Sequence, residues 1–408
     1  MKTDVQVAVI GGGIVGASVL YWLAKMGWTD SVLIERRELT SGSTWHAAGN
    51  TTYFGPYAAM TSLFAGSVRT YLQAEAETGQ SVGFHQTGSL RLATTQRELA
   101  QFESYIPRYA QLGLPYVIRT PDEVSDLHPL IDTSDIFGAA HTPTDGHVDP
   151  TGATQALAKA ARALGATILR QCPVEHLSNQ NGKWVLHTPK GPIRAQHVVI
   201  ATSFWAREML EPLGLNLPLY AAEHHEIITE ALPDVANRDT ELPAMRESYV
   251  SCNVRQEGDG LLIGIYETEP EFWALDGIPK DFREELLPPN TDRLMPHLER
   301  LMDRMPAFAT AGIKTINNGP LCFTPDGLPM IGPLAGHDGL WLASGFNVGI
   351  GTGGGSGEFL AHWMTQGRPP FDLASVHADR FGNDMTKETA LAAMRKVYAQ
   401  GYKLPETI

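Results

Sequence analysis

The sequence has few cysteines, a deficit of positive charge and no long hydrophobic run, and each shortage excludes a class of protein. Its three cysteines, Cys172, Cys252 and Cys322, lie too far apart for a disulfide framework or a zinc site, so we expect a reducing compartment and no bound metal. With 31 lysines and arginines against 45 aspartates and glutamates, the net charge of −14 argues against nucleic acid or an anionic membrane surface as a partner. No stretch approaches the roughly 18 apolar residues of a membrane span, and the apolar run at residues 5–10 is too short for a signal peptide. These shortages together predict a soluble cytoplasmic protein.

The rest of the composition is that of a globular protein. Hydrophobic residues make up 43% of the chain and charged residues 19%, which excludes disorder as its main theme. The length of 408 residues is enough for two or three domains. The 40 glycines gather toward both ends of the chain, and this clustering is a first indication of a functional site.

The N-terminus carries a dinucleotide-binding fingerprint. A predicted strand at residues 5–10 leads into G-x-G-x-x-G at 11–16, a predicted helix at 17–26 and a second strand at 31–34 that ends in an acidic residue. In such a motif the first glycine permits a tight turn, the second lets the backbone approach a pyrophosphate, and the third lets helix and strand pack closely. The acid at the end of the second strand binds the ribose hydroxyls. The cofactor contacts expected from this region are Gly11, Gly13, Ile14, Val15, Gly16, Glu35 and Arg36.

The segment after the fingerprint favours FAD over NAD. Residues 39–50 form a small polar loop bounded by glycines, which can line a cofactor with hydroxyls and backbone N–H groups. An NAD domain would normally continue with βα repeats, whereas this chain continues into long mixed segments.

Within that loop the chain resembles a known family. The stretch Gly42-Ser43-Thr44-Trp45-His46-Ala47-Ala48-Gly49, supported by residues 83–92, 145–150, 325–332 and 345–350, is similar to the flavoprotein part of the dimethylglycine and sarcosine dehydrogenases. These belong to the glycine oxidase and D-amino-acid oxidase superfamily, and the resemblance covers essentially the whole chain. It implies an α/β fold in which a Rossmann-type FAD-binding domain, residues 1–84, 145–216 and 317–408, is interleaved with an antiparallel-sheet substrate-binding domain, residues 85–144 and 217–316.

The resemblance also implies how FAD is held. The family's histidine at the position of His46 is bonded covalently to the flavin 8α-methyl group; the alternative is a loop histidine that only donates or accepts hydrogen bonds. The family residue at Val174 contacts the adenine through its backbone. Ser203 departs from the family's A-x-G pattern and requires either an accommodating φ or a more distant flavin. The further FAD contacts expected are Gly42, Ser43, Thr44, Trp45, His46, Ala47, Ala48, Gly49, Val174, Trp205, Gly345, Phe346, Asn347, Val348, Gly349 and Ile350.

Local signals predict further elements along the chain. Thr120 is a candidate N-cap for a helix that starts at Pro121, and Asp149-Pro150 opens another helix. Strands are predicted at residues 84–94, 193–194 and 198–201.

Two predicted strands carry the expected substrate contacts. Period two places His224 and Glu226 on one face of the strand at 224–229, where the family histidine faces the substrate. We expect His224 to orient the substrate and to manage protons near working pH, and Glu226 to be either paired with a cation or protonated. On the strand at 249–256, Asn253 and Arg255 share a face. Arg255 could pair with Glu226 or bind a substrate carboxylate, and Arg91 is a second candidate for that role.

Three departures from the family bear on the substrate and the electron acceptor. The family has an aromatic residue in place of Glu226 and tyrosines near Cys252 and Asn253, which indicates the same chemistry on a different amine. In the related monomeric sarcosine oxidases a Gly-x-Lys-x-Gly stretch activates oxygen, whereas residues 260–264 here have Leu262 at its centre. This difference favours a dehydrogenase that passes electrons to a carrier protein.

These observations predict an FAD-dependent oxidoreductase that oxidises the C–N bond of a small secondary or tertiary amine, such as dimethylglycine or sarcosine, and releases formaldehyde. Family members often continue into a folate-binding domain, so a separate folate enzyme is a possible partner besides the electron carrier. The alternatives are an oxidase of a primary or cyclic amino acid, and a flavoprotein subunit that only transfers electrons.

Overall fold

The computed structural model describes residues 3–55, 58–382 and 384–404. The first of its two large sheets has eight strands in the order β18-β19-β11-β1-β2-β8, with β10 and β9 attached to β11. β1 pairs in parallel with both β2 and β11, as a nucleotide-binding sheet requires. The strands are β1 (Asp4–Ile10), β2 (Ser31–Ile34), β8 (Thr167–Leu169), β9 (His176–Gln180), β10 (Lys183–His187), β11 (Ile193–Ile200), β18 (Met330–Pro333) and β19 (Leu340–Ser344).

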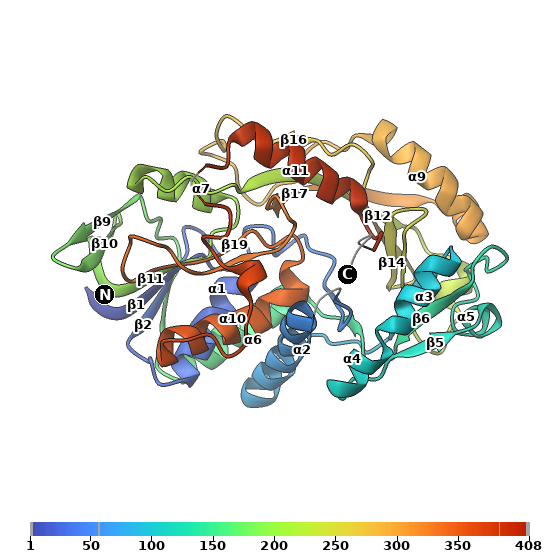
Figure 1. Ribbon diagram of the computed structural model, residues 1–408, viewed down its shortest axis with the longest axis horizontal. Helices are drawn as coiled ribbons and strands as arrows, with labels where there is room; N and C mark the ends of the chain where they lie inside the picture. Colours follow the sequence, from blue (N-terminus) through green and yellow to red (C-terminus); the bar gives the residue numbers. More distant parts are fainter. Residues whose placement is uncertain (1–2, 56–57, 383, 405–408) are drawn as a thin grey trace.

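A layer of helices packs together beside this sheet. α1 (Ile14–Lys25) contacts α6 (Pro150–Ala163) and α10 (Gly349–Gln366), and α10 also contacts α2 (Ala58–Thr78) (Figure 1). The glycines of α10 allow this packing, because a Cβ on Gly355 would lie 2.2 Å from the Leu63 oxygen and one on Gly357 would lie 2.6 Å from the Ser18 backbone. The glycine run that follows residue 350 is therefore a helix-packing feature.

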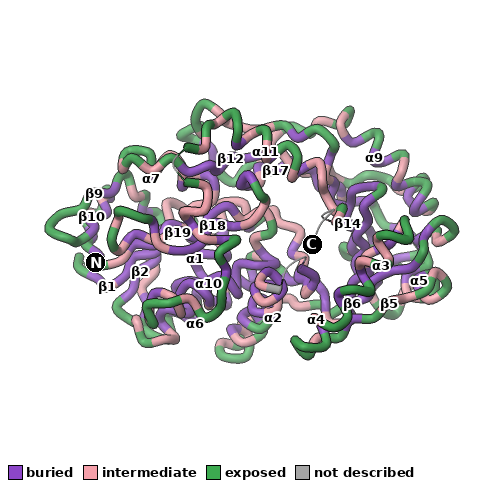
Figure 2. Tube along the Cα trace, viewed as in Figure 1, coloured by how far each residue is buried: buried purple, intermediate pink, exposed green. Residues whose placement is uncertain are grey.

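The second sheet has nine strands in the order β16-β12-β15-β14-β13-β4-β6-β5, with β17 on β12. Its pairs are antiparallel except for β13 with β4, which run in parallel. Buried residues follow the strands of both sheets, and exposed residues follow the outer loops and helices (Figure 2). The strands are β4 (Ser89–Ala93), β5 (Val117–Arg119), β6 (Gly138–Thr142), β12 (Tyr220–Thr229), β13 (Ala244–Glu247), β14 (Cys252–Glu257), β15 (Gly260–Ile265), β16 (Phe272–Trp273) and β17 (Ile313–Phe323). The predicted α/β architecture, with a Rossmann-type layer interleaved with an antiparallel sheet, is confirmed.

Of the remaining helices, α7 packs Ala206 and Leu210 against strands of the first sheet. The expected N-cap Thr120 forms a capping box with Glu123, and Asp149 caps α6 as the Asp-Pro pair predicted. These helices are α3 (Gln96–Ser104), α4 (Ile106–Gln111), α5 (Pro121–Leu127), α7 (Trp205–Leu210), α8 (Pro233–Ala236), α9 (Thr291–Arg304) and α11 (Lys387–Gln400). Within the described part of the chain, no helix has both the length and the apolar character needed to cross a membrane.

Several predicted limits differ from the structure. The strand predicted from residue 84 begins at Ser89, the strand predicted from residue 249 begins at Cys252, and the two short strands predicted within 193–201 are one strand, β11. The expected domain limit at residue 317 falls inside β17, which pairs with β12 along its length. α11, expected in the FAD-binding domain, packs Met394 and Tyr398 against residues of β12 and β17.

Candidate active site

The first cavity, about 410 Å³, lies where the carboxyl ends of β1 and β2 meet the start of α1. Glu35, at the end of β2, accepts hydrogen bonds from the backbone N–H of Gly12 at 2.7 Å and of Arg37 at 2.8 Å. Burial raises its pKa above the ordinary value, although these backbone hydrogen bonds oppose the effect. The carboxylate oxygens thus hold the glycine turn and border the cavity at the expected ribose position.

The glycine turn itself has the geometry of a dinucleotide cradle. Gly11 has φ of +111°, and a Cβ there would lie 2.3 Å from the Ala201 oxygen. A Cβ on Gly16 would lie 2.0 Å from the Gly11 oxygen, so this glycine permits close packing of helix on strand and does not itself line the cavity. Gly13, the N-cap of α1, has no side chain to occupy the helix N-terminus, where an anion is favoured.

Other expected FAD contacts surround the same cavity. Ser203 has φ of +55°, which is the accommodating conformation that its departure from glycine required, and the neighbouring Thr202 hydroxyl is buried without a partner among the described residues. Such an orphaned hydroxyl fits a polar group of a bound cofactor. The Arg36 guanidinium lies 4.3 Å from the centre of the Trp205 ring. The predicted residues that line this cavity are Gly11, Gly13, Ile14, Val15, Glu35, Arg36, Gly42, Ser43, Thr44, Ala47, Val174, Trp205, Phe346, Asn347, Gly349 and Ile350.

Three predicted FAD contacts line neither of the two cavities described here: Gly16, Trp45 and Gly345. Gly16 packs α1 on β1, as described above. Trp45 is 37% exposed and points its ring edge-on to His46, with ring centres 5.3 Å apart. Gly345 has φ of +81° and shapes the turn after β19.

A second cavity, about 370 Å³, adjoins the first, and its wall includes three more predicted FAD contacts, Ala48, Gly49 and Val348. The two cavities share six lining residues, namely Ser43, Ala47, Leu321, Asn347, Gly349 and Ile350. A ligand spanning the first cavity therefore reaches the second at this shared wall.

His46 borders the second cavity beside β12 and β17. Burial lowers its pKa to about 4, so the imidazole is neutral at pH 7. The ring occupies space left by Gly319, since a Cβ there would lie 2.4 Å from Cε1 and 2.5 Å from Nδ1 of His46. Gly319 is paired with His224 across the sheet, so the missing side chain admits His46 next to His224. Nothing in the local sequence pointed to Gly319.

His224 borders the second cavity, as predicted from its strand face. The prediction of a pKa near working pH was wrong, because burial lowers the pKa of His224 to about 4. Its Nδ1 lies 3.5 Å from the Tyr398 hydroxyl, and its ring centre lies 4.7 Å from that of Tyr266. The residue is thus a neutral imidazole in an aromatic surrounding.

Glu226 also borders this cavity, and Arg255 does not. Burial raises the pKa of Glu226 to about 7, although the charge of Arg255 and a hydrogen bond from the Ala48 backbone lower it. The expected ion pair with Arg255 is absent. Arg255 instead pairs with Glu257 at 2.6 Å and donates from Nε to the Ala48 oxygen at 2.9 Å, because its position on β14 lies behind the loop of His46. Glu226 and Arg255 therefore hold the Ala48 peptide from its two sides.

Two arginines lie side by side on neighbouring strands of the cavity wall. Arg91 on β4 is in register with Arg246 on β13, and both line the second cavity. Burial, followed by the charge of Arg246, lowers the pKa of Arg91 to about 10, so it remains charged at pH 7. Among the described residues, neither arginine has an ion pair with a carboxylate. Arg91 was a candidate from the sequence, and Arg246 was missed.

Tyrosines reach the cavity from positions that the sequence did not indicate. Asn253 donates from Nδ2 to the Tyr402 hydroxyl at 2.7 Å, and its Oδ1 accepts from Asn50 at 3.0 Å. Tyr266, at the end of β15, and Tyr402, after α11, both line the cavity. The chain lacks the tyrosines that the family has near Cys252 and Asn253, and two other segments supply tyrosines to the cavity.

Leu262, which stands at the centre of the Gly260–Gly264 stretch, is buried within β15, opposite Ile228 and Arg255, and lines neither cavity. The carrier protein as electron acceptor stays a prediction from the sequence.

Both the cradle and the adjoining cavity are features of one class of protein. The family model described as FAD dependent oxidoreductase matches residues 6–363, and the chain belongs to this family, with FAD as its cofactor. Over 403 residues the chain is 41% identical to the mitochondrial dimethylglycine dehydrogenase of Mus musculus, a match that covers 97% of this chain and 46% of that protein. It is 33% identical to the mitochondrial sarcosine dehydrogenase of the same species, a match that covers 99% of this chain and 44% of that protein. The chain spans about half the length of these curated relatives.

A solved structure agrees with this assignment. L-proline dehydrogenase from P. horikoshii superposes with a TM-score of 0.80 at 27% identity, covering 93% of this chain and 98% of that one. The likeness therefore extends through both sheets and both cavities.

Proposed function

We propose that the chain oxidises the C–N bond of a small N-methylated amino acid, with dimethylglycine and sarcosine as the first candidates. The single observation that carries this proposal is the pair of charged arginines, Arg91 and Arg246, in a buried cavity that adjoins the FAD cradle. Similarity to dimethylglycine and sarcosine dehydrogenases supports the same class of substrate.

The arginines recognise the carboxylate end of the substrate. Arg246 is buried and Arg91 is partly buried, and the buried Asp145, on whose carboxyl the charge of Arg246 acts, is a single acid beside two guanidinium groups. An anionic ligand offsets the remaining cost of burying these two charges. Guanidinium groups also match a carboxylate with paired hydrogen bonds. The substrate is thereby anchored at β4 and β13, with its amine directed toward β12.

His224 and Glu226 act at the amine end. Oxidation requires the neutral amine, whose lone pair supports the developing iminium, so a proton must leave the ammonium form. Glu226, with a pKa of about 7, can accept that proton near pH 7, while His224, a neutral imidazole with a pKa of about 4, accepts a hydrogen bond from the amine and orients it. FAD, when bound, accepts the hydride, and water then hydrolyses the iminium to formaldehyde and the demethylated amine.

We also propose that His46 is bonded to the flavin. The support is its neutral imidazole on the wall of the second cavity, next to the shared residue Ala47, and its place in the GSTWHAAG stretch. Acid precipitation tests this bond, because covalently held flavin stays yellow in the pellet.

The test of the proposed reaction is anaerobic flavin reduction. The panel contains dimethylglycine, sarcosine, proline, glycine and dimethylaminoethanol, which carries the N-methyl groups without the carboxylate, and each reaction is assayed for formaldehyde. Bleaching with formaldehyde from the N-methyl amino acids supports the proposal. Bleaching by proline or glycine alone supports the amino-acid oxidase alternative, which the likeness to L-proline dehydrogenase favours. No bleaching by any amine supports an electron-transfer subunit.

A variant pair tests the arginine assignment separately. Arg246→Gln removes charge-assisted hydrogen bonds of about 1.5–3 kcal/mol, so KM for carboxylate substrates should rise about tenfold to 150-fold. Reduction by dimethylaminoethanol should change little. Arg207→Gln is the matched control, since Arg207 lies over the Tyr220 ring outside both cavities. Equal losses on both kinds of amine would refute carboxylate recognition by Arg246.

A further inference from the structure

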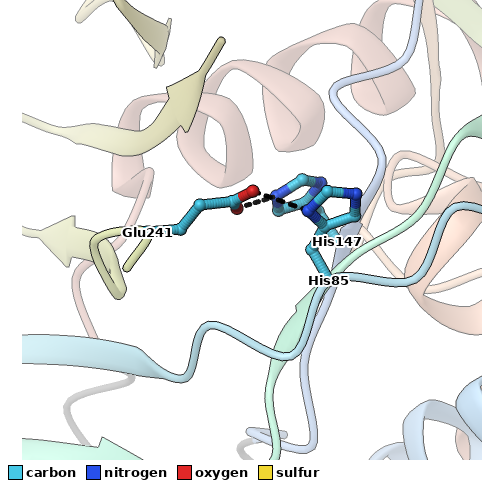
Figure 3. A group of neighbouring side chains, drawn as sticks. All are labelled: His85, His147 and Glu241. Atoms are coloured by element: carbon cyan, nitrogen blue, oxygen red, sulfur yellow. Dashed lines mark hydrogen bonds and ion pairs between the residues drawn. The ribbon is translucent and has the colours of Figure 1, made fainter. Parts of the chain in front are cut away.

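Two sequence stretches singled out above, residues 83–92 and 145–150, meet away from both cavities. His85 and His147 come from these stretches, and Glu241 comes from the loop before β13 (Figure 3). His85 Nδ1 lies 2.6 Å from one Glu241 oxygen, and His147 Nε2 lies 3.1 Å from the other. One ligand atom from each of the three side chains lies within 4.8 Å of the other two.

We propose that His85, His147 and Glu241 bind one divalent transition-metal cation of the zinc class. Two imidazoles and a carboxylate form a three-ligand set that zinc accepts, leaving a fourth position for water. Zinc–ligand bonds of about 2.0–2.1 Å in a tetrahedron place ligand atoms roughly 3.3 Å apart. The two histidine–carboxylate separations here are 2.6 and 3.1 Å, and all three ligand atoms lie within 4.8 Å of one another. The side chains therefore need small movements to surround an ion.

The backbone holds the two histidines in place before any ion binds. His85 and His147 are directly opposite each other, and each donates its N–H to the other's oxygen, at 2.9 and 3.1 Å. Their rings stack with centres 4.8 Å apart. The close approach depends on Gly146, where a Cβ would lie 2.0 Å from the His85 oxygen. Preorganised ligands reduce the entropy lost on binding.

Charge at the cluster suits a cation. Glu241 supplies a carboxylate whose two oxygens each face one of the histidines. The nearby guanidinium of Arg255 is offset by Glu257 at 2.6 Å.

The cluster is open to solvent and joins parts of the chain that are distant in sequence. The side chains of His85 and Glu241 are 51% and 33% exposed, which gives an ion an entry path. His147 lies in the short strand β7 (Gly146–His147), opposite Asn50 of β3 (Asn50–Thr51), and Asn50 contacts Asn253 of the second cavity. A bound ion would therefore fix the loop before β13 to two of the chain segments that connect the two sheets, one strand away from the second cavity.

The test is calorimetric titration of chelator-treated, FAD-loaded protein with Zn²⁺ alone. We expect one Zn²⁺ per chain and no comparable heat from Mg²⁺, which prefers oxygen ligands. Glu241→Gln and His85→Gln should each weaken Zn²⁺ binding by about tenfold or more. His176→Gln is the matched control, because His176 and His187 also stack, with ring centres 3.8 Å apart, but no carboxylate of the described residues completes a three-ligand group with them.

The outcomes separate cleanly. Binding at one Zn²⁺ per chain that survives both variants, or that disappears in His176→Gln, overturns the site, as does the absence of stoichiometric binding to the parent protein. Melting of the metal-free variants at the parent temperature shows that any loss of Zn²⁺ binding comes from lost ligands. Should Glu241→Gln fail to fold, His85→Gln decides alone, since its side chain is half exposed. The inference does not depend on the substrate proposed above.

Discussion

Replacing Gly319 with alanine should displace the His46 ring. The added Cβ would lie 2.4 Å from His46 Cε1, whereas ordinary van der Waals contact begins near 3.4 Å, so about 1 Å of movement is needed. β17 cannot supply it, because Gly319 is paired with His224 in the middle of a long antiparallel ladder. The imidazole must therefore turn away from the junction of the two cavities. A displacement of this size at a reacting group costs about 100-fold in rate, or about 2.7 kcal/mol.

The assay measures flavin in the acid pellet and anaerobic reduction by the best amine. Gly319→Ala should lose acid-stable flavin and reduce about 100-fold more slowly, yet still retain FAD through the G-x-G-x-x-G turn. Thr315→Ala on the same strand is the control for a general disturbance of β17. In the His46→Ala background the Gly319 change should have no further effect, because the clash is gone. If Gly319→Ala retains as much acid-stable flavin as wild type and is reduced at the wild-type rate, the His46 ring is not displaced and this reasoning is refuted.

Three further predictions concern acidic and imidazole groups of the two cavities. Glu35→Ala in the His46→Ala background should weaken FAD retention by about 1.5–3 kcal/mol, and unchanged FAD affinity would exclude the ribose assignment. The pKa of Glu226 is raised from 4.5 to about 7 in the folded protein, so the folded state binds this proton more tightly than the unfolded chain. The contribution of Glu226 to the free energy of unfolding is therefore complete below pH 4.5 and is lost as the pH rises through 7, a change of about 3 kcal/mol. Glu226→Gln should therefore gain stability relative to wild type between pH 5 and pH 8 in denaturant unfolding, and parallel pH curves would contradict this. His224→Asn should lower kcat/KM about 10²-fold or more. In the wild-type plot of kcat/KM against pH, the limb that reports titration of His224 should lie near its pKa of about 4. A His224-dependent limb at neutral pH would show that its burial has been misjudged.

The sequence predicted best what depends on neighbours along the chain. The glycine fingerprint, the acid at the end of β2 and the caps at Thr120 and Asp149 are local patterns, and the structure forms each of them as expected. Period two also placed His224 and Glu226 on the cavity face of β12. These features follow from backbone geometry over a few residues.

The sequence did not predict what depends on pairing between distant strands. Arg246 reaches the cavity because β13 pairs in parallel with β4, about 150 residues earlier in the chain, and Gly319 matters because β17 lies on β12. The alternation of side chains along a strand placed Arg255 on the same face as Asn253, but it could not show how far along β14 the cavity extends. Arg255 lies beyond the cavity and donates to the Ala48 oxygen behind the His46 loop. The pKa of His224 was misjudged because burial is a tertiary property.

The partition of the two cavities separates the evolution of substrate choice from that of redox chemistry. The second cavity is lined by residues of β4, β12, β13, β14 and β17, by the loop around His46 and by the end of α11 with the segment after it, and Arg91, Glu226 and Arg246 do not line the first cavity. A substitution at Arg91 or Arg246 therefore changes the second cavity without replacing a residue that lines the first. A duplicated copy of such a chain can acquire a new amine through single mutational steps, each of which retains a functional hydride acceptor. Mutations of the shared wall do not have this freedom, since they alter both halves of the reaction at once.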